Sequence, residues 1–268
     1  MEKQNIISGF LNVDNTQPEF LKNFLEEVSK RQHVRESFEI QLGLLEIHEG
    51  DQVLDIGCGI GVQAKEMAAL VGKTGMVTGT DLSTAMIDIA QNSTATSGLP
   101  LKFMVADAVH QPFVSESFDC LRTERVLMYI KDTAAAFTEF KRLLKPGGRL
   151  VVFDTDWDAM MIAHTDKALT RKIVRYVSDS FPSGRVGGEL FHYLKDNGFK
   201  DVKVKPFSYT DRQLDVTKKI CEGVLQTGVS EGVFTANEIA AWWEVLKQDL
   251  KNDKFFASYS CFIVSGTK

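Results

Sequence analysis

Residues 55–61, which read Asp-Ile-Gly-Cys-Gly-Ile-Gly, carry the strongest chemical signal in the chain. They complete a short apolar run, beginning at Val53, that is typical of a buried strand. Three alternating glycines let the backbone approach a ligand closely and leave the N-terminus of the next helix aimed at it. We predict that this loop binds the carboxylate or phosphate of a ligand and is more than a tight turn.

A second carboxylate stands at the end of the next apolar run. Asp81 lies about twenty residues after the glycine loop, where a carboxylate can accept both hydroxyl protons of a ribose. The alternative is that Asp81 merely caps the following helix, although Ser83 is the better-placed capping residue. The loop and the acid together indicate a bound nucleoside.

The glycine spacing bears on which nucleoside is bound. The dinucleotide fingerprint G-x-G-x-x-G would place its third glycine at position 62, where this chain has Val62. The chain also offers no recognisable Ser/Tyr/Lys arrangement for hydride transfer. An NAD-dependent oxidoreductase is therefore disfavoured, although it stays an alternative.

Composition and charge exclude several classes of protein. With 268 residues, 44% of them apolar and 25% charged, the chain is an ordinary globular one, neither disordered nor fibrous. It has no apolar stretch of about 20 residues, and residues 1–10 lack the apolar region of a signal peptide. We expect a cytoplasmic protein with no membrane partner.

The remaining composition argues against nucleic-acid and metal binding. Lys and Arg number 31 against 36 Asp and Glu, so nucleic acid would need a local basic patch. The lysines at 200, 203 and 205 are better explained as the wet face of a strand. The four cysteines lie far apart, without a C-x-x-C pair or a histidine at ligand spacing, so no metal site is expected.

The hydrophobic pattern predicts the elements that position these residues. From residue 50 onward, short apolar runs alternate with helical lengths, as in a parallel sheet built from β-α-β units. The core strands are expected at 53–56, 76–81, 101–105, 118–123 and 149–154, with helices starting near Gly61, Ser83 and Thr133. Further helices are expected at 166–181, 187–197 and twice within 214–250, and further strands at 202–207 and 258–264.

The first 48 residues are predicted to be helical. Apolar residues recur at i, i+4 spacing from Phe20 to Val28, after a start at 16–18, and again from Phe38 to Leu45. We expect these helices and the 214–250 region, which carries Phe234, Trp242 and Trp243, to fold over the carboxyl edge of the sheet and enclose a small acceptor. The aromatic residues are better explained as core packing than as the wall of that cavity.

The whole chain is expected to form one α/β domain, residues 1–268, with a doubly wound, mostly parallel seven-stranded sheet whose last strand is antiparallel. Residues 1–48 are its N-terminal helices, residues 49–155 its cofactor-binding core, and residues 156–268 its substrate-side helices and closing strands. The late helices are candidates for a lid.

A series of motifs in order resembles the class I S-adenosylmethionine-dependent methyltransferases. Within them it is similar to the ubiquinone/menaquinone-biosynthesis methyltransferase-like branch, also called methyltransferase type 11. The resemblance covers about residues 50–155 and is very specific. Its motifs are residues 53–61 (VLDIGCGIG), 79–83 with Met86 (GTDLS), 106–108 with 112–113 (ADA, PF), 117–119 (SFD) and 142–150 (RLLKPGGRL).

The resemblance implies S-adenosylmethionine as the cofactor, S-adenosylhomocysteine as the product and a Rossmann-like fold. The glycine loop would hold the methionine moiety, Asp81 the ribose hydroxyls and Leu82 one face of the adenine. Asp107 would accept from the adenine amine, and the backbone amide of Ala108 would donate to a ring nitrogen. The alternative for Asp107 is a turn residue after a strand. The implied cofactor-binding residues are Asp55, Gly57, Cys58, Gly59, Gly61, Asp81, Leu82, Met86, Asp107, Ala108 and Glu124.

The chain departs from the family where the transferred methyl group points. At the end of the fourth strand the family has small or apolar residues, whereas this chain reads Arg-Thr-Glu-Arg at 122–125. Glu124, Arg125 and Tyr129 could line the reaction cavity, or an Arg–Glu pair could simply brace the loop. Asp154, Asp156 and Trp157 could likewise grip a cationic or aromatic substrate, or start the next helix.

No catalytic base has a supporting motif. Methyl transfer from a sulfonium needs alignment of the reactants and exclusion of water, and a base only if the acceptor must lose a proton. His110, His164 and His192 are the candidate bases, with Tyr129 and Glu124 behind them, and Arg125 is a further catalytic candidate. The alternative for His192 is a position on the surface of a helix. We predict methyl transfer to carbon, oxygen or nitrogen of a small molecule. The alternative is a protein that binds S-adenosylmethionine without transferring its methyl group.

Overall fold

A seven-stranded sheet runs through the computed structural model, which describes residues 6–15 and 18–268. Its strand order is β3-β2-β1-β4-β5-β7-β6, and β7 is antiparallel to both of its neighbours. The predicted sheet with one reversed strand is thereby confirmed. The strands are β1 Gln52–Ile56, β2 Met76–Asp81, β3 Leu101–Val105, β4 Phe118–Glu124, β5 Leu144–Ile162, β6 Lys200–Asp211 and β7 Ala257–Thr267.

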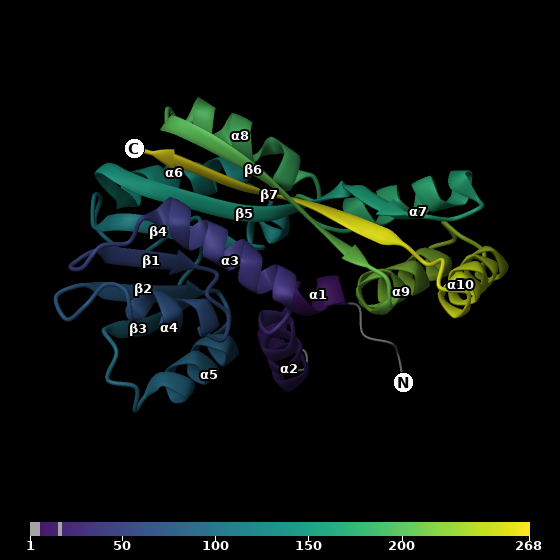
Figure 1. The fold of residues 1–268 in the computed structure, drawn as a ribbon, viewed down its shortest axis with the longest axis horizontal. Helices are drawn as coiled ribbons and strands as arrows, with labels where there is room; N and C mark the ends of the chain where they lie inside the picture. The colour runs from purple at the N-terminus through teal and green to yellow at the C-terminus, as the bar shows by residue number, and fades with distance from the viewer. Residues whose placement is uncertain (1–5, 16–17) are drawn as a thin grey trace.

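Helices cover both faces of this sheet (Figure 1). On one face α3, α4 and α5 pack against the strands, and on the other α6, α7 and α8 do so. The helices are α1 Ile6–Leu11, α2 Pro18–Ser29, α3 Gln32–Leu45, α4 Val62–Ala68, α5 Thr84–Thr94, α6 Thr133–Leu143, α7 Lys167–Asp179, α8 Val186–Asp196, α9 Asp215–Ser230 and α10 Ala236–Lys251, with single 3-10 turns η1 Val13–Asn15 and η2 Leu127–Tyr129.

Local sequence explains where the core helices begin. The side chain of Ser83 accepts from the Met86 amide and starts α5, and Asp132 does the same for α6 through Ala135. Gly61 starts α4 in the left-handed backbone conformation, with φ of 78°. A Cβ there would come within 2.6 Å of the Phe103 ring, so only glycine fits both the backbone and the packing.

The fifth strand is longer than the predicted range of 149–154. β5 continues to Ile162 because it pairs with β7 along Arg149–Asp156 and again at Met161 and Ile162, with an irregularity between. The two long strands form an arm that extends to the right of Figure 1, where α7, α9 and α10 gather. The amphipathic stretch predicted from 166 is α7, with Asp166 as its N-cap.

The N-terminal helices lie against the carboxyl ends of the parallel strands. The two segments with predicted apolar stripes form α2 and α3. A further short helix, α1, contacts α9. The expected start at 16–18 falls partly outside the described residues, since the structure describes α2 only from Pro18 onward.

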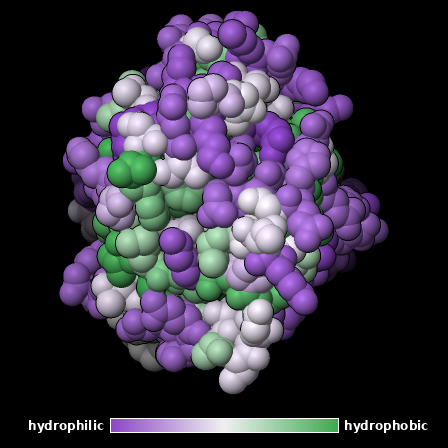
Figure 2. All heavy atoms as spheres, turned by 90° about the vertical axis from the view of Figure 1, so that its left-hand side faces the viewer, coloured by the Kyte–Doolittle hydropathy of each residue, from purple (hydrophilic) through white to green (hydrophobic). Residues whose placement is uncertain are grey.

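The opposite edge of the sheet, at the amino ends of the parallel strands, faces the viewer in Figure 2. Hydrophilic residues dominate that face and surround a band of hydrophobic ones. Within the described part of the chain, no helix is both long and apolar enough to cross a membrane.

Candidate active site

A single continuous cavity of about 330 Å³ lies at the carboxyl ends of the strands. This is the edge at which open α/β sheets bind their ligands, and the volume falls within the range of small-molecule sites. Its walls come from the glycine loop, from the ends of β2, β3 and β4, from β5 and β6, and from the helices α1, α2 and α9. The cavity therefore joins the predicted nucleoside site to the underside of the N-terminal helices.

Ten of the eleven residues predicted to bind the cofactor line this cavity. They are Asp55, Gly57, Cys58, Gly59, Asp81, Leu82, Met86, Asp107, Ala108 and Glu124. Gly61 is the exception, because it is buried and faces Phe103 and Ala90 in the core. Gly61 starts α4, and its contact with the ligand stays a prediction.

Gly57 and Gly59 of the glycine loop differ in how closely neighbouring side chains pack against them. Gly57 has φ of 72°, and a Cβ there would come within 2.1 Å of Val126. Gly59 also has a positive φ, of 53°, but an added Cβ would meet only Leu25 at 3.4 Å. The loop thus presents bare backbone to the cavity, with Leu25 of α2 above it.

Asp81 is held in a fixed orientation at the end of β2. Its carboxylate accepts from the Gly59 amide at 2.9 Å and from the Ser83 amide at 3.0 Å. Burial raises the pKa of Asp81, and these backbone amides offset only part of the rise. Each carboxylate oxygen keeps a further lone pair, so Asp81 can still accept hydroxyl protons from a ligand in the cavity.

Three further predicted residues line the cavity near Asp81. Leu82 is 70% exposed although it is apolar, and it lines the cavity. Asp107 and Ala108, which follow β3, also line the cavity. Asp107 also accepts from the Val109 amide at 3.0 Å, so the expected turn role and an open carboxylate coexist.

A buried charge network lies beneath the glycine loop. Arg122 donates to Asp55 at 2.8 Å, to Gln41 at 2.8 Å and to Glu124. Glu124 also pairs with Arg125 at 2.6 Å. Burial alone would raise the pKa of Glu124, but Arg125 and Arg122 outweigh it and hold that pKa below its usual range. The bracing Arg–Glu pair is thus present, and both of its members also line the cavity.

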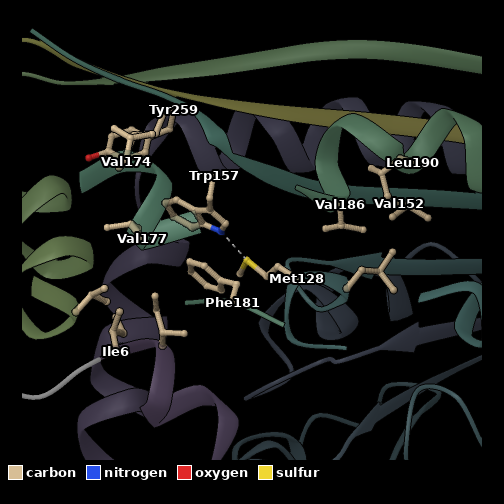
Figure 3. Close-up of a cluster of buried hydrophobic side chains, with 14 of the residues drawn as sticks. Ile6, Met128, Val152, Trp157, Val174, Val177, Phe181, Val186, Leu190 and Tyr259 are labelled. Carbon is tan, nitrogen blue, oxygen red and sulfur yellow. Dashed lines mark hydrogen bonds between the residues drawn. The ribbon is translucent and has the colours of Figure 1, made fainter. Parts of the chain in front are cut away.

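Aromatic side chains enclose the other end of the cavity. Trp157 and Phe181 stack with ring centroids 4.9 Å apart, and Tyr129 lies 5.7 Å from Phe181 and 5.8 Å from Phe10. Figure 3 shows Trp157 donating to the Met128 sulfur across this cluster, at 3.1 Å. Burial raises the pKa of Tyr129, so its hydroxyl stays protonated and can donate a hydrogen bond.

Several predicted residues lie elsewhere. Asp154 is fully buried, where it accepts from the Leu127 and Thr155 amides, and Asp156 caps its own turn through the amides of Asp158 and Ala159. Neither lines the cavity, whereas Trp157 does. The expected grip by two acids and a tryptophan is therefore wrong for the acids.

The histidine candidates lie outside the cavity, and His192 has the helix-surface position that was its alternative. His192 is exposed on α8, and neither it nor His110 lines the cavity. His164 is outside it as well, with its ring nitrogens close to the Trp242 carbonyl and the Asp166 amide.

Only part of the 214–250 region reaches the cavity. Val216, Lys219 and Ile220 of α9 line it, whereas Phe234 and Trp242 are buried elsewhere. Trp242 donates to Thr170 on α7 at 3.0 Å, so α10 packs against α7. The expectation that these aromatics are core packing is confirmed for both residues.

One histidine that lines the cavity has no motif around it. His33, near the start of α3, stacks on Tyr209 of β6 with ring centroids 4.4 Å apart. The available signal was a polar stripe, because His33, Ser37 and Gln41 recur at i, i+4 and i+8 on one side of the helix. Within the described residues, no group of three or more acidic, histidine or cysteine side chains could hold a metal ion.

Comparison with known proteins agrees with this geometry. A family described as "Methyltransferase domain" matches residues 54–152. A demethylmenaquinone methyltransferase of Staphylococcus aureus is 33% identical over 180 residues, covering 60% of this chain and 73% of its own length. An uncharacterised protein from a Streptomyces fradiae transposon is 30% identical over 246 residues, covering 90% of this chain and 70% of its own.

Solved structures share the fold. The crystal structure of a putative methyltransferase from Bacillus halodurans superposes with a TM-score of 0.63 and 16% identity, covering 86% of this chain and 98% of that one. Three observations support one family assignment. They are the glycine loop, the acids at the ends of β2 and β3, and the 33% identity over most of a curated methyltransferase. The chain belongs to the class I S-adenosylmethionine-dependent methyltransferases, which transfer a methyl group from that cofactor to an acceptor.

Proposed function

We propose that this enzyme methylates a small, apolar acceptor that is wholly enclosed during the reaction. The observation that carries the proposal is the continuity of the cavity, which runs from the glycine loop to the aromatic cluster of Phe10, Tyr129, Trp157 and Phe181. An acceptor in that cluster would meet the cofactor's methyl group inside the protein. An enclosed acceptor also favours a small molecule over a protein or a nucleic acid.

The cofactor would occupy the loop side of the cavity. Asp81 would accept from the ribose hydroxyls, while Leu82 and the Asp107–Ala108 turn would hold the adenine. The backbone of Gly57 to Gly59 would surround the methionine moiety. Asp55 and Glu124 border that loop and would attract its ammonium group, with Arg122 keeping both carboxylates in place.

Residues at the acceptor side would mainly align the acceptor with the methyl group of the cofactor. Methyl transfer from a sulfonium is an in-line displacement on an activated donor, so positioning and exclusion of water carry most of the rate. Arg125 and Tyr129 would contact the acceptor from the end of β4, and the stacked Trp157 and Phe181 would set its plane.

Calorimetric titration with S-adenosylmethionine, S-adenosylhomocysteine and NAD tests the cofactor assignment. We expect micromolar binding of the two sulfur nucleosides and none of NAD. Protein as purified should first be checked for bound nucleoside, because a filled site would mask the titration. Binding without any methyl transfer, over a broad set of phenols, quinols and amines, would favour a protein that binds S-adenosylmethionine but has no transferase activity.

We also propose a cytoplasmic location. The four cysteines are buried as free thiols, which suits a reducing compartment. Fractionation of cells that produce the protein tests this, and recovery from a secreted or membrane fraction would contradict it.

A further inference from the structure

His33 places an imidazole on the wall of the cavity, near the proposed acceptor end. Its imidazole is half-buried, lines the cavity and lies flat on Tyr209, with an angle of 5° between the rings. Across residues 6–15 and 18–268, neither of its ring nitrogens has a hydrogen-bond partner. His164, by contrast, has a polar partner near each nitrogen. A fixed imidazole with a free nitrogen is therefore available to a ligand.

Arg31 and Lys219, which line the cavity together with His33, are already paired. Arg31 lies 2.8 Å from Glu27 and 2.5 Å from Asp215. Lys219 contacts the same two carboxylates, at 3.1 and 3.3 Å. These two cations and two anions balance, so the wall that they form offers no surplus charge to an acceptor. A neutral acceptor fits this end of the cavity better than an ionic one.

Position adds a second argument. Gln41, eight residues after His33 on α3, donates to Glu124 at the end of β4 at 2.9 Å. Eight residues of helix span about 12 Å, so α3 runs from the charge network at Glu124 to the part of the cavity wall that His33 shares with Tyr209. Arg125, next to Glu124 at the end of β4, lines the same cavity. His33 and the end of β4, toward which the methyl group would point, thus border one space.

We propose that His33 is the proton acceptor of the reaction and that the acceptor is an apolar molecule bearing a neutral hydroxyl group. This inference rests on the proposed function. The acceptor oxygen forms a bond to the methyl carbon while the bond from that carbon to the sulfonium sulfur breaks. The hydroxyl proton passes to the free His33 nitrogen, and S-adenosylhomocysteine leaves as a neutral thioether. The products are a methyl ether and an imidazolium, which returns its proton to water.

The electrostatics of the site suit this role. Burial, assisted by Arg125 and Arg31 and opposed by Glu36, lowers the pKa of His33 to about 4. The imidazole is therefore neutral at pH 7 and can accept a proton. A weak base is sufficient, because the attacking oxygen becomes a strongly acidic oxonium as its bond to carbon forms. The same surroundings make the imidazolium short-lived, which readies the site for the next turnover.

The first test measures whether His33 recognises a hydroxyl group. Enzyme loaded with S-adenosylhomocysteine is titrated with 2-naphthol and with 2-methoxynaphthalene, which differ in the hydroxyl proton. We expect wild type to bind 2-naphthol about tenfold more tightly, the effect of one hydrogen bond. His33→Ala should lose this preference, His33→Gln should keep part of it, and the exposed control His192→Ala should keep all of it.

The second test follows methyl transfer to 2-naphthol against pH. Wild type should have a flat rate from about pH 6 to 8, because His33 stays neutral throughout. His33→Ala should be slowed by about 100-fold or more at pH 7. Its rate should then rise about tenfold per pH unit, since it would depend on preformed naphtholate. Added imidazole should restore part of the activity of His33→Ala.

The outcomes separate the two proposals. Failure of wild type to bind S-adenosylhomocysteine would reject the proposed function itself. Binding of S-adenosylhomocysteine but of neither naphthalene would overturn the apolar hydroxyl acceptor. A hydroxyl preference without methylated product, or an unchanged rate and pH profile in His33→Ala, would overturn the role of His33 as proton acceptor.

Discussion

Asp55 and Arg122 stand opposite each other on the neighbouring parallel strands β1 and β4, and their side chains form an ion pair of 2.8 Å. Both side chains are almost fully buried. The pair joins the acid that opens the glycine loop to the strand that ends at the acceptor side. Its geometry therefore links the two halves of the cavity.

Removing Arg122 should destabilise the protein severely. Arg122→Met leaves the buried carboxylates of Asp55 and Glu124 without their shared cation, which typically costs about 3–5 kcal/mol. Urea unfolding measures the loss. Arg175→Met is the matched control, because its pair with Asp179 is exposed and should be worth less than about 0.5 kcal/mol. Equal stability of the two variants would mean that the buried pair is dispensable.

Asp81 should be required for cofactor affinity. Asp81→Asn removes the charge that would accept the ribose hydroxyls, at a cost of about 1.5–3 kcal/mol, or roughly 10- to 100-fold in Kd. Calorimetry with S-adenosylhomocysteine measures the effect, with the exposed Asp88→Asn as control. Unchanged affinity in a folded Asp81→Asn protein would remove Asp81 from the ribose site.

Two substitutions of Arg125 should separate the effect of its backbone strain on stability from the effect of its side chain on turnover. Its φ of 55° lies in the left-handed region, which costs a non-glycine residue about 1 kcal/mol. Arg125→Gly should therefore be more stable than Arg125→Ala by about that amount in urea unfolding. Both variants should reduce turnover more than cofactor binding, because both lose the guanidinium. Affinity and turnover falling together would place Arg125 on the cofactor side instead.

Ionisation of Asp154 should lower the stability of the fold as pH rises. Burial raises the pKa of Asp154 to about 7, whereas an unfolded aspartate has a pKa of about 3.9. Between these values only the folded carboxyl holds the proton, so this group makes unfolding easier with increasing pH. His33, whose pKa is lowered, contributes in the opposite sense, so the effect is measured as a difference between variants. In urea unfolding at about pH 5 and pH 8, the stability of wild type and of the exposed control Asp196→Asn should fall relative to that of Asp154→Asn. Parallel profiles would contradict the assignment.

Asp14 should hold the N-terminal helices against the start of α5. From η1 it accepts from the Ser83 hydroxyl and from the Thr84 and Ala85 amides, which lie at the start of α5 beside the ribose site. Asp14→Ala should cost about 1 kcal/mol, like the loss of a helix cap, and should release S-adenosylhomocysteine severalfold faster. Stopped-flow release rates compare it with Asp88→Ala on the exposed side of α5. Identical rates would mean that the contact does not control access.

The local chemistry of the cofactor site could be predicted because each part lies within a few residues of a strand end. The glycine loop, Asp81 and Asp107 follow β1, β2 and β3 directly, and parallel strands bring their carboxyl ends to one edge. Their order in the sequence thus becomes adjacency in space. The sequence did not show that Gly61 lies outside the cavity wall, because alternating glycines look alike in sequence and only packing decides which one faces Phe103.

The acceptor end could not be predicted in this way. Phe10, His33, Phe181 and Tyr209 come from distant segments that meet only after α1 and α3 dock against the sheet. An amphipathic pattern shows that a helix buries one face, but not which element covers it. The same limit concealed that β5 continues past Asp154, because its partner β7 lies about a hundred residues further along the chain.

The sequence by itself determined the sheet and the cofactor and predicted ten residues that line the cavity, since strand periodicity and loop chemistry are local properties. Only the tertiary structure decided that Arg122 pairs with Asp55, that Asp154 accepts from the loop after β4 and does not line the cavity, and that His33 does line it. These relationships depend on how helices and strands pack over long sequence separations, and side-chain packing of that kind leaves no periodic trace in the chain.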